Sequence, residues 1–201
     1  GKYHSILIEQ LDVLAELLNG LKTGGLFKHE IPVIFRPWHE HTGHWFWWGA
    51  KSCTPEEYKA LYRYTVNYLK NEKGVHNVLF AYSPDVFQDK AHYMDRYPGD
   101  EFVDILGLDY YYRYDNLERI QSDLPQKLGL VSELAAEHNK VAAFTDAGDE
   151  KALINSGALI AGGDDLVDRV ANGEIGFDVA IATPNMMKKM GKVARVLGPK
   201  G

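Results

Sequence analysis

The chain has 201 residues, of which 45% are hydrophobic and 25% charged, a composition typical of a globular protein with a buried core. Its net charge of −6 argues against a protein that binds nucleic acid along its whole length, and its single cysteine, Cys53, excludes an internal disulfide. No apolar run is long enough to cross a membrane. The first residues do not have the pattern of a signal peptide. We therefore expect that a leader has been removed or that the sequence is the interior of a longer chain.

The first half of the chain predicts a helix, a strand and a second helix. Residues 5–22 repeat apolar positions at helical spacing up to Gly24, and residues 31–36 contain an apolar run with the length of a buried strand. Thr54 is followed by a proline and, three positions later, by Glu57, which is the pattern of a capping box. This pattern predicts a helix over residues 55–72.

The next hundred residues continue the alternation. We expect strands over residues 77–82, 102–108 and 140–144, with a polar loop over 86–101. Residues 116–138 are expected to be mainly helical, with a break or restart at Pro125 and Gly129. Short continuous apolar strands that alternate with helices predict an α/β fold with a parallel sheet buried on both faces.

Polar and aromatic residues gather at the carboxyl ends of these strands. They are Trp38-His39-Glu40, Ser83 and Asp85, Asp109 to Tyr111, and Thr145-Asp146. In a (β/α)8 barrel this end of the sheet carries the active site, and an open doubly wound sheet has the same polarity. The pattern favours a barrel but leaves both architectures open.

Composition changes near residue 150. Residues 151–201 carry seven Lys/Arg and five Asp/Glu, and Phe177 is the only aromatic residue after Phe144. We therefore expect two segments, 1–149 and 150–201. The second segment predicts further short α/β elements, among them a strand over 177–182 and a basic helix over 186–197.

Glu40 and Asp146 are the candidate catalytic carboxylates. Each lies at the end of a predicted strand, so both could face one cleft. A glycosidase needs two carboxyl groups across the scissile bond: a proton donor, and either a nucleophile or a more distant base. The alternative is that each carboxylate only binds backbone amides at its strand end.

The aromatic and histidine residues around Glu40 also suggest a carbohydrate site. All four tryptophans lie in residues 38–48, as a platform for sugar rings or as core. We expect His39 to orient a carboxylate or a sugar hydroxyl, and His41 and His44 to be loop or subsite residues. No carboxylate or cysteine stands at ligand spacing from these histidines, so we predict no metal and no other cofactor. Of Tyr110, Tyr111 and Tyr112, one or two should face the cleft, because strand residues alternate in direction.

Two stretches carry a resemblance to a known family. Arg36-Pro-Trp-His-Glu-His-Thr-Gly-His-Trp-Phe-Trp-Trp-Gly49 and Tyr97-Pro-Gly-Asp-Glu-Phe-Val-Asp-Ile-Leu-Gly-Leu-Asp-Tyr-Tyr111 resemble the glycoside hydrolase family 26 β-mannanases. The resemblance implies a (β/α)8 barrel and a retaining mechanism on β-mannan oligosaccharides or polysaccharides, in a secreted, periplasmic or cell-surface protein. By position, it implies Glu40 as the acid/base and Asp146 as the nucleophile. It implies substrate-binding roles for His39, Trp45, Trp48, Asp109 and Tyr111.

The chain departs from this family pattern in two ways. The family nucleophile is a glutamate, whereas this chain has Thr145-Asp146-Ala147-Gly148. If residues 31–36 are strand four of the barrel, strands one to three are absent and the chain holds strands four to seven. We therefore expect a partial barrel with impaired activity. A non-catalytic carbohydrate-binding remnant is the alternative.

The tail resembles a different protein. Gly162-Gly-Asp-Asp-Leu166, Phe177-Asp-Val-Ala-Ile-Ala-Thr-Pro-Asn-Met-Met187 and the closing Gly191-Lys192 stretch resemble the second domain of the stalk protein of the large ribosomal subunit. The chain then reads as a chimera joined near residue 149. In the family of this ribosomal protein, the contacts with RNA come mainly from the other domain. We therefore expect the basic residues of the helix over 186–197 to form a face exposed to solvent. An RNA-binding or structural α/β chimera is the third hypothesis.

Overall fold

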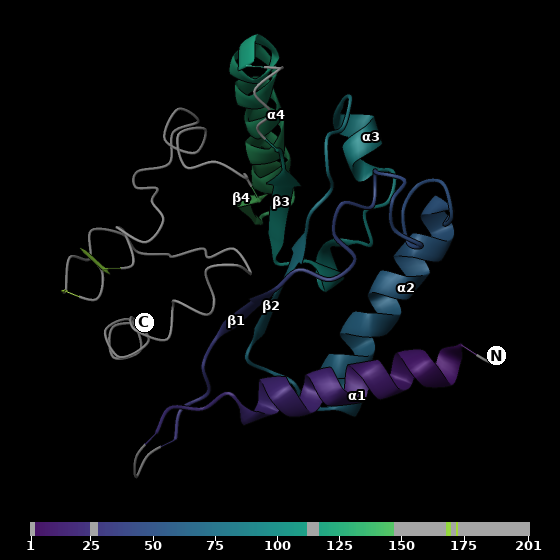
Figure 1. Cartoon of the computed structure of the whole chain (residues 1–201), viewed down its shortest axis with the longest axis vertical. Coiled ribbons are helices and arrows are strands. Elements are labelled where there is room, and N and C mark those ends of the chain that lie inside the picture. Colours follow the sequence, from purple (N-terminus) through teal and green to yellow (C-terminus); the bar gives the residue numbers. More distant parts are fainter. Residues whose placement is uncertain (1–2, 25–27, 112–116, 147–167, 170–171, 173–201) are drawn as a thin grey trace. The chain divides into compact units, whose positions relative to one another are not determined.

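The computed structural model describes residues 3–24, 28–111, 117–146, 168–169 and 172. Within them, four strands form one sheet in the order β1-β2-β3-β4 (Figure 1). The strands are β1 (Val33–Phe35), β2 (Val78–Tyr82), β3 (Ile105–Asp109) and β4 (Val141–Asp146). β1 runs parallel to β2, and β2 runs parallel to β3. The predicted α/β class with a parallel sheet is confirmed.

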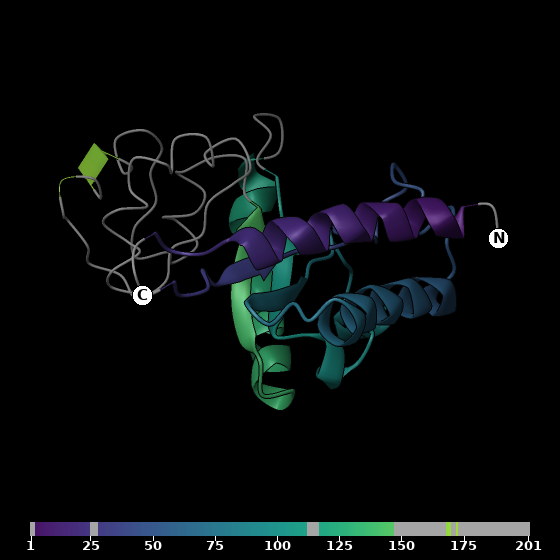
Figure 2. The same ribbon diagram turned by 90° about the horizontal axis from the view of Figure 1, so that it is seen from below.

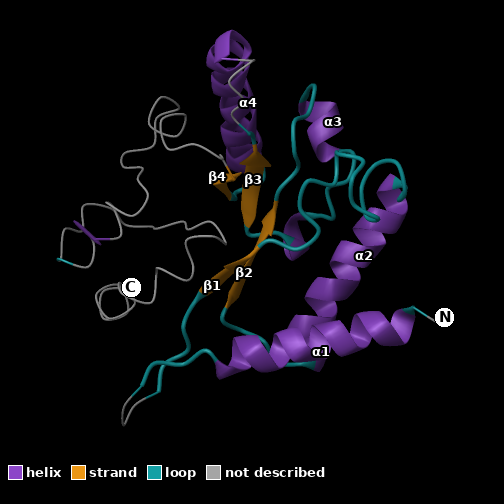
Figure 3. Cartoon of the chain, viewed as in Figure 1, coloured by secondary structure: helices purple, strands orange, loops and turns teal. Residues whose placement is uncertain are grey.

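Helices separate the strands (Figure 3). They are α1 (His4–Gly20), α2 (Pro55–Asn67), α3 (Lys90–Met94) and α4 (Leu117–Glu137). A π-helical segment, Tyr68–Glu72, prolongs α2, and a 3-10 turn, Asp100–Phe102, precedes β3. The predicted helix over 55–72 therefore exists, but its last five residues change helical type.

Local sequence explains where α2 begins. The Thr54 side chain accepts a hydrogen bond from the Glu57 backbone N–H, and the Glu57 carboxylate accepts one from the Thr54 backbone N–H at 2.9 Å. This reciprocal pair satisfies two amides that the first helical turn leaves without partners. The predicted capping box is confirmed.

α1 and the end of α2 lie side by side in both views (Figure 2). The Tyr68 hydroxyl donates to Asp12 at 2.6 Å, and Lys73 forms an ion pair with Asp12 at 2.7 Å. The Asn19 amide donates to the Lys73 carbonyl. These bonds fix α1 against the π-helical segment, and Leu11, Ala15 and Leu18 form its buried face.

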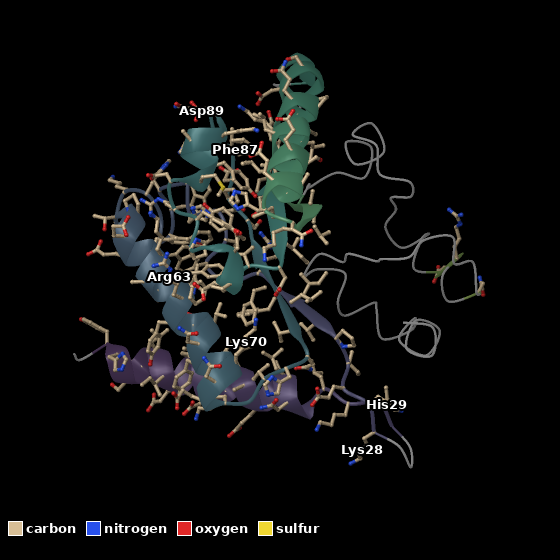
Figure 4. All side chains as sticks on the ribbon, turned by 180° about the vertical axis from the view of Figure 1, so that it is seen from behind. Lys28, His29, Arg63, Lys70, Phe87 and Asp89 are labelled. Carbon is tan, nitrogen blue, oxygen red and sulfur yellow. The ribbon has the colours of Figure 1, made fainter. Side chains whose placement is uncertain are left out.

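The core between α2 and the sheet is aromatic. Tyr58, Tyr62, Phe80, Tyr82 and Tyr93 are fully buried. The Tyr82 hydroxyl donates to the Tyr93 carbonyl and the Tyr93 hydroxyl donates to the Gly107 carbonyl, so their polar ends are satisfied inside the core. Lys70 of the π-helical segment lies over the Phe80 ring, at 5.2 Å (Figure 4). This contact shows which way the Phe80 side chain faces.

Two expectations about the elements are wrong. The stretch 86–101 was expected to be a polar loop, but it holds α3, which begins where the Asp89 carboxylate accepts a hydrogen bond from the His92 backbone N–H. α4 is continuous through Pro125. An interior proline costs about 3 kcal/mol. Here burial of the apolar residues on both sides of it, Leu124, Val131 and Leu134, offsets that cost.

The chain divides into two compact units, residues 1–108 with 129–143 and residues 109–128 with 144–201. The boundary near residue 149 stays a prediction. The strands and the basic helix expected in the tail lie outside the described residues. No helix of the part that the structure describes is long and apolar enough to cross a membrane.

Candidate active site

The loop that follows β1 is fixed to β2 and α2. The Glu40 backbone N–H donates to the carbonyl of Ser83, the residue directly after β2, at 2.8 Å. The Trp38 indole N–H donates to the Thr65 hydroxyl of α2, and the Trp38 carbonyl accepts from the Tyr58 hydroxyl, both at 3.0 Å. The loop is therefore held from two sides before it reaches Glu40.

The backbone of this loop adopts an uncommon conformation at two positions. Trp38 and Glu40 both have φ of 53°, the left-handed region that side chains other than glycine seldom occupy. Each such residue costs about 1–2 kcal/mol, and such residues cluster at functional sites. The Ser83, Thr65 and Tyr58 hydrogen bonds hold this turn in place.

The Glu40 carboxylate is almost enclosed. The residue is 7% exposed, and its Oε2 accepts a hydrogen bond from the Trp45 indole N–H at 2.7 Å. That short bond fixes the orientation of the carboxyl group. The carboxyl group is thus positioned at the end of a parallel strand, where it can donate or accept a proton at a bound ligand.

Trp45 is held by Gly43 and open to solvent at the same time. A Cβ at residue 43 would lie 2.4–2.7 Å from atoms of the Trp45 ring, so only glycine allows the ring to lie against the backbone there. Half of Trp45 is nonetheless exposed. A ring that is fixed at one edge and bare elsewhere can contact a ligand without first having to be ordered.

Replacing Trp45 by phenylalanine should lower any activity that depends on the Glu40 carboxyl group about tenfold or more, because a hydrogen bond to a charged group contributes about 1.5–3 kcal/mol. Phenylalanine keeps an aromatic ring but has no N–H to donate to Glu40. Trp47→Phe is the matched control, since Trp47 is 60% exposed. Initial rates with galactomannan measure the effect. Equal losses in the two variants would contradict the role of the indole N–H.

Trp48 and His39 contact each other and Phe46 within the loop. The Trp48 indole N–H donates to the His39 carbonyl at 2.9 Å, and its ring stacks on Phe46 with 4.3 Å between centroids and 9° between planes. His39 meets Phe46 edge-on at 5.2 Å. Trp48 therefore has a structural part in the loop, and the sugar contacts expected of His39 and Trp48 stay predictions.

His41 lies in the loop, as expected, but its side chain belongs to the core. It is fully buried, with its ring between Tyr58 and Tyr82 at 4.3 and 4.7 Å. Among the residues that the structure describes, neither ring nitrogen has a hydrogen-bond partner. Burial and the positive charge of Arg96 hold the pKa of His41 well below its ordinary value of 6.5. The imidazole is a neutral core residue directly after Glu40.

Exposure rises from Asp109 to Tyr111 at the end of β3. Asp109 is fully buried, Tyr110 is 4% exposed, and Tyr111 is 36% exposed. The Tyr110 hydroxyl donates to Asp123 at 3.0 Å. Tyr110 therefore has a structural role. Tyr111 has the more accessible ring of the two, and Tyr112 lies outside the described residues.

Asp146 is the last residue of β4, so it ends the strand and does not follow it. Its side chain is not among those that the structure describes. Among the described residues, no group of three or more His, Cys, Asp or Glu side chains could hold a metal ion.

Comparison with known proteins identifies the family. The model of glycosyl hydrolase family 26 matches residues 1–159. The chain belongs to glycosyl hydrolase family 26. The expected resemblance is confirmed, and the family match continues beyond the boundary expected near residue 149.

Individual relatives agree with the family assignment. A mannan endo-1,4-beta-mannosidase of Bifidobacterium adolescentis is 42% identical over 154 residues, which cover 74% of this chain and 15% of the relative. One of Bacillus subtilis is 37% identical over 107 residues, covering 50% and 28%. The catalytic domain of a Bacillus sp. JAMB-750 family 26 endo-beta-1,4-mannanase is 42% identical with a TM-score of 0.71, covering 78% of this chain and 44% of that one. The chain thus spans less than half the length of these family 26 relatives, as a partial barrel does.

A second similarity concerns a ribosomal protein. The large ribosomal subunit protein uL1 of Maridesulfovibrio salexigens is 43% identical over 105 residues, which cover 51% of this chain and 42% of that protein. This agrees with a resemblance to a protein of the large ribosomal subunit, and the 105 matched residues are more than residues 151–201 contain. The chain therefore combines similarity to two unrelated proteins.

Proposed function

We propose that this family 26 chain is a retaining endo-1,4-β-mannanase of reduced activity. The observation that carries the proposal is the enclosed Glu40 carboxylate, held by the Trp45 indole N–H at the end of a parallel strand. The names of the similar mannan endo-1,4-beta-mannosidases indicate the substrate class. β-Mannan oligosaccharides and polysaccharides are the proposed ligands, and other β-glycans are the related alternatives.

In the proposed reaction, Glu40 gives its proton to the glycosidic oxygen as the bond to the anomeric carbon breaks. The Asp146 carboxylate attacks that carbon and forms a covalent glycosyl-enzyme. Glu40, now ionised, takes a proton from a water molecule, whose oxygen attacks the anomeric carbon and releases Asp146. Two inversions at one carbon retain its configuration.

The surrounding residues have supporting roles in this proposal. Trp45 orients Glu40 through its N–H and offers its exposed ring to a sugar. Tyr111 would hold the Asp146 carboxylate, and Asp109 and His39 would help to bind the substrate. Apolar faces of sugars stack on aromatic rings, and Trp47, 60% exposed, adds further aromatic surface beside Trp38 at 5.5 Å.

The test is release of reducing sugar from galactomannan by the 201-residue chain. We expect a slow release that Glu40→Gln abolishes, because the amide has the shape of the carboxyl group but no proton to give. Activity that survives Glu40→Gln would contradict the proposed acid/base.

A carbohydrate-binding role without catalysis is the second candidate. The exposure of Trp45 and Trp47 favours it, since both rings are accessible whatever the state of the nucleophile. Calorimetry with a manno-oligosaccharide separates the two: binding by a chain that hydrolyses nothing, even with glutamate at position 146, supports the second candidate. The basic residues on which an RNA-binding hypothesis depends lie outside the described residues.

A further inference from the structure

Arg96 is a buried cation that the proposed reaction does not use. It lies shortly after α3 and is 5% exposed. Its Nη2 donates to the Cys53 carbonyl at 2.6 Å, whereas its Nη1 is buried and has no hydrogen-bond partner among the described residues. Burying a charged group costs free energy unless the group is well paired. A guanidinium kept inside the fold for a bond to a backbone carbonyl indicates that this carbonyl has to be held in place.

The Cys53 carbonyl lies at the far end of the loop between β1 and α2. The Cys53 backbone N–H donates to the Gly49 carbonyl at 3.0 Å, and the Ala50 N–H donates to the Gly43 carbonyl at 2.8 Å. A Cβ at residue 49 would lie 2.5 Å from that Gly43 oxygen, so the two backbones are in close contact. The end of the loop is thus bonded to Gly43, the residue against which the Trp45 ring lies.

Arg96 also contacts the residue that holds the first part of this loop. Its guanidinium carbon lies over the ring of Tyr58, 5.8 Å from the centroid, within the range in which a cation and an aromatic ring attract each other. The Tyr58 hydroxyl donates to the Trp38 carbonyl at 3.0 Å. One buried guanidinium therefore contacts the supports of both ends of the loop, and Glu40 lies between those ends.

We propose that Arg96 is a positioning residue for Glu40. By bonding Cys53 and packing on Tyr58, it holds the loop in the conformation that brings the Trp45 indole N–H to the Glu40 carboxyl group. In this role Arg96 touches no substrate, and it acts only through the direction in which Glu40 presents its proton. The inference rests on the proposed function, in which Glu40 is the acid.

Arg96→Met tests this role with two substrates, because methionine fills a similar space without a charge or an N–H donor. Galactomannan needs a proton on its leaving oxygen, whereas a dinitrophenyl β-manno-oligosaccharide loses dinitrophenolate, a stable anion that needs none. General acid catalysis contributes about 10²–10⁴-fold, so we expect kcat/KM on galactomannan to fall about tenfold or more and kcat/KM on the dinitrophenyl substrate to change less than about threefold. Glu40→Gln should show the same preference more strongly. A variant that only weakened the fold would lose both activities equally.

Tryptophan emission reports on the loop without any need for activity. All four tryptophans of the chain lie in residues 38–48, so emission excited where tyrosine does not absorb comes from this loop alone. We expect the emission maximum of folded Arg96→Met, measured without urea, to differ from that of the wild type. If the wild type hydrolyses neither substrate, the proposed function fails, and the emission still decides whether Arg96 holds the loop.

Arg63→Met is the matched control. The Arg63 Nε donates to the Pro98 carbonyl at 2.6 Å, and its guanidinium carbon lies over the Phe102 ring at 5.6 Å, which are the same two kinds of contact away from the loop. This variant should leave the emission and the ratio of the two kcat/KM values unchanged. Arg96→Lys keeps the charge and a single, shorter donor. It should fall between the wild type and Arg96→Met in both measurements, and it replaces the methionine variant if that variant does not fold.

Four results would overturn the proposal. The first is an equal loss on the two substrates in Arg96→Met. The second is a folded Arg96→Met with the emission of the wild type. The third is the same substrate preference in Arg63→Met. The fourth, where only the lysine variant folds, is an Arg96→Lys chain identical to the wild type in both measurements.

Discussion

Replacing Asp146 by glutamate is expected to raise the rate of reducing-sugar release from galactomannan by about 10²-fold or more, because a reacting atom misplaced by about 1 Å can cost that factor. Aspartate is one methylene shorter than the glutamate of the family pattern, so in the proposed mechanism its oxygen would stop short of the anomeric carbon. The longer side chain restores the reach without changing the charge. Initial rates at saturating substrate measure the gain.

The same substitution combined with Glu40→Gln should stay inactive. The gain from Asp146→Glu depends on a proton donor across the scissile bond, and the glutamine removes it. A folded Asp146→Glu chain that binds manno-oligosaccharide but gains no activity would contradict the assignment of position 146 as nucleophile. An active double variant would contradict Glu40 as the acid.

His41 is expected to make the protein acid-labile. Its pKa in the folded protein lies well below the ordinary value of 6.5, because burial and the Arg96 charge disfavour the imidazolium. Below pH 6.5 the unfolded chain therefore binds a proton that the folded chain does not. The free energy of unfolding should fall as the pH drops below about 6.5, with a contribution from this one group of up to about 1.4 kcal/mol per pH unit.

His41→Phe tests this directly, since phenylalanine keeps a ring between Tyr58 and Tyr82 and cannot titrate. Urea unfolding at pH 5, 6, 7 and 8 should show a shallower decline for this variant than for the wild type. His76→Phe, at an exposed position, should retain the wild-type slope. Equal slopes for His41→Phe and the wild type would contradict a buried neutral histidine.

Local signals were sufficient to predict most of the fold. The capping box at Thr54 and the apolar runs at 33–35 and 78–82 specify their own elements, because each depends on residues close in sequence. The continuity of α4 through Pro125 was not predicted. It depends on the burial of Leu124, Val131 and Leu134 in the fold, which outweighs the local preference of proline.

The candidate site was predictable in its residue types but not in its contacts. The cluster around Glu40 indicated a carbohydrate site. The indole donor of Trp45, the Ser83 anchor and the burial of His41 depend on how the loop folds over β2 and α2. No spacing in the sequence distinguishes His41, which is buried, from His44, which is exposed, because both lie in one irregular loop.

The separation of the Glu40 and Asp146 carboxyl groups tests the central claim most directly. A crystal structure of the chain with a bound manno-oligosaccharide would measure it. A retaining mechanism predicts about 5–5.5 Å between the two groups, lengthened by about the 1 Å that the missing methylene removes. A separation well beyond about 9.5 Å, the upper end for inverting glycosidases, would contradict the proposal that these two residues form one active site.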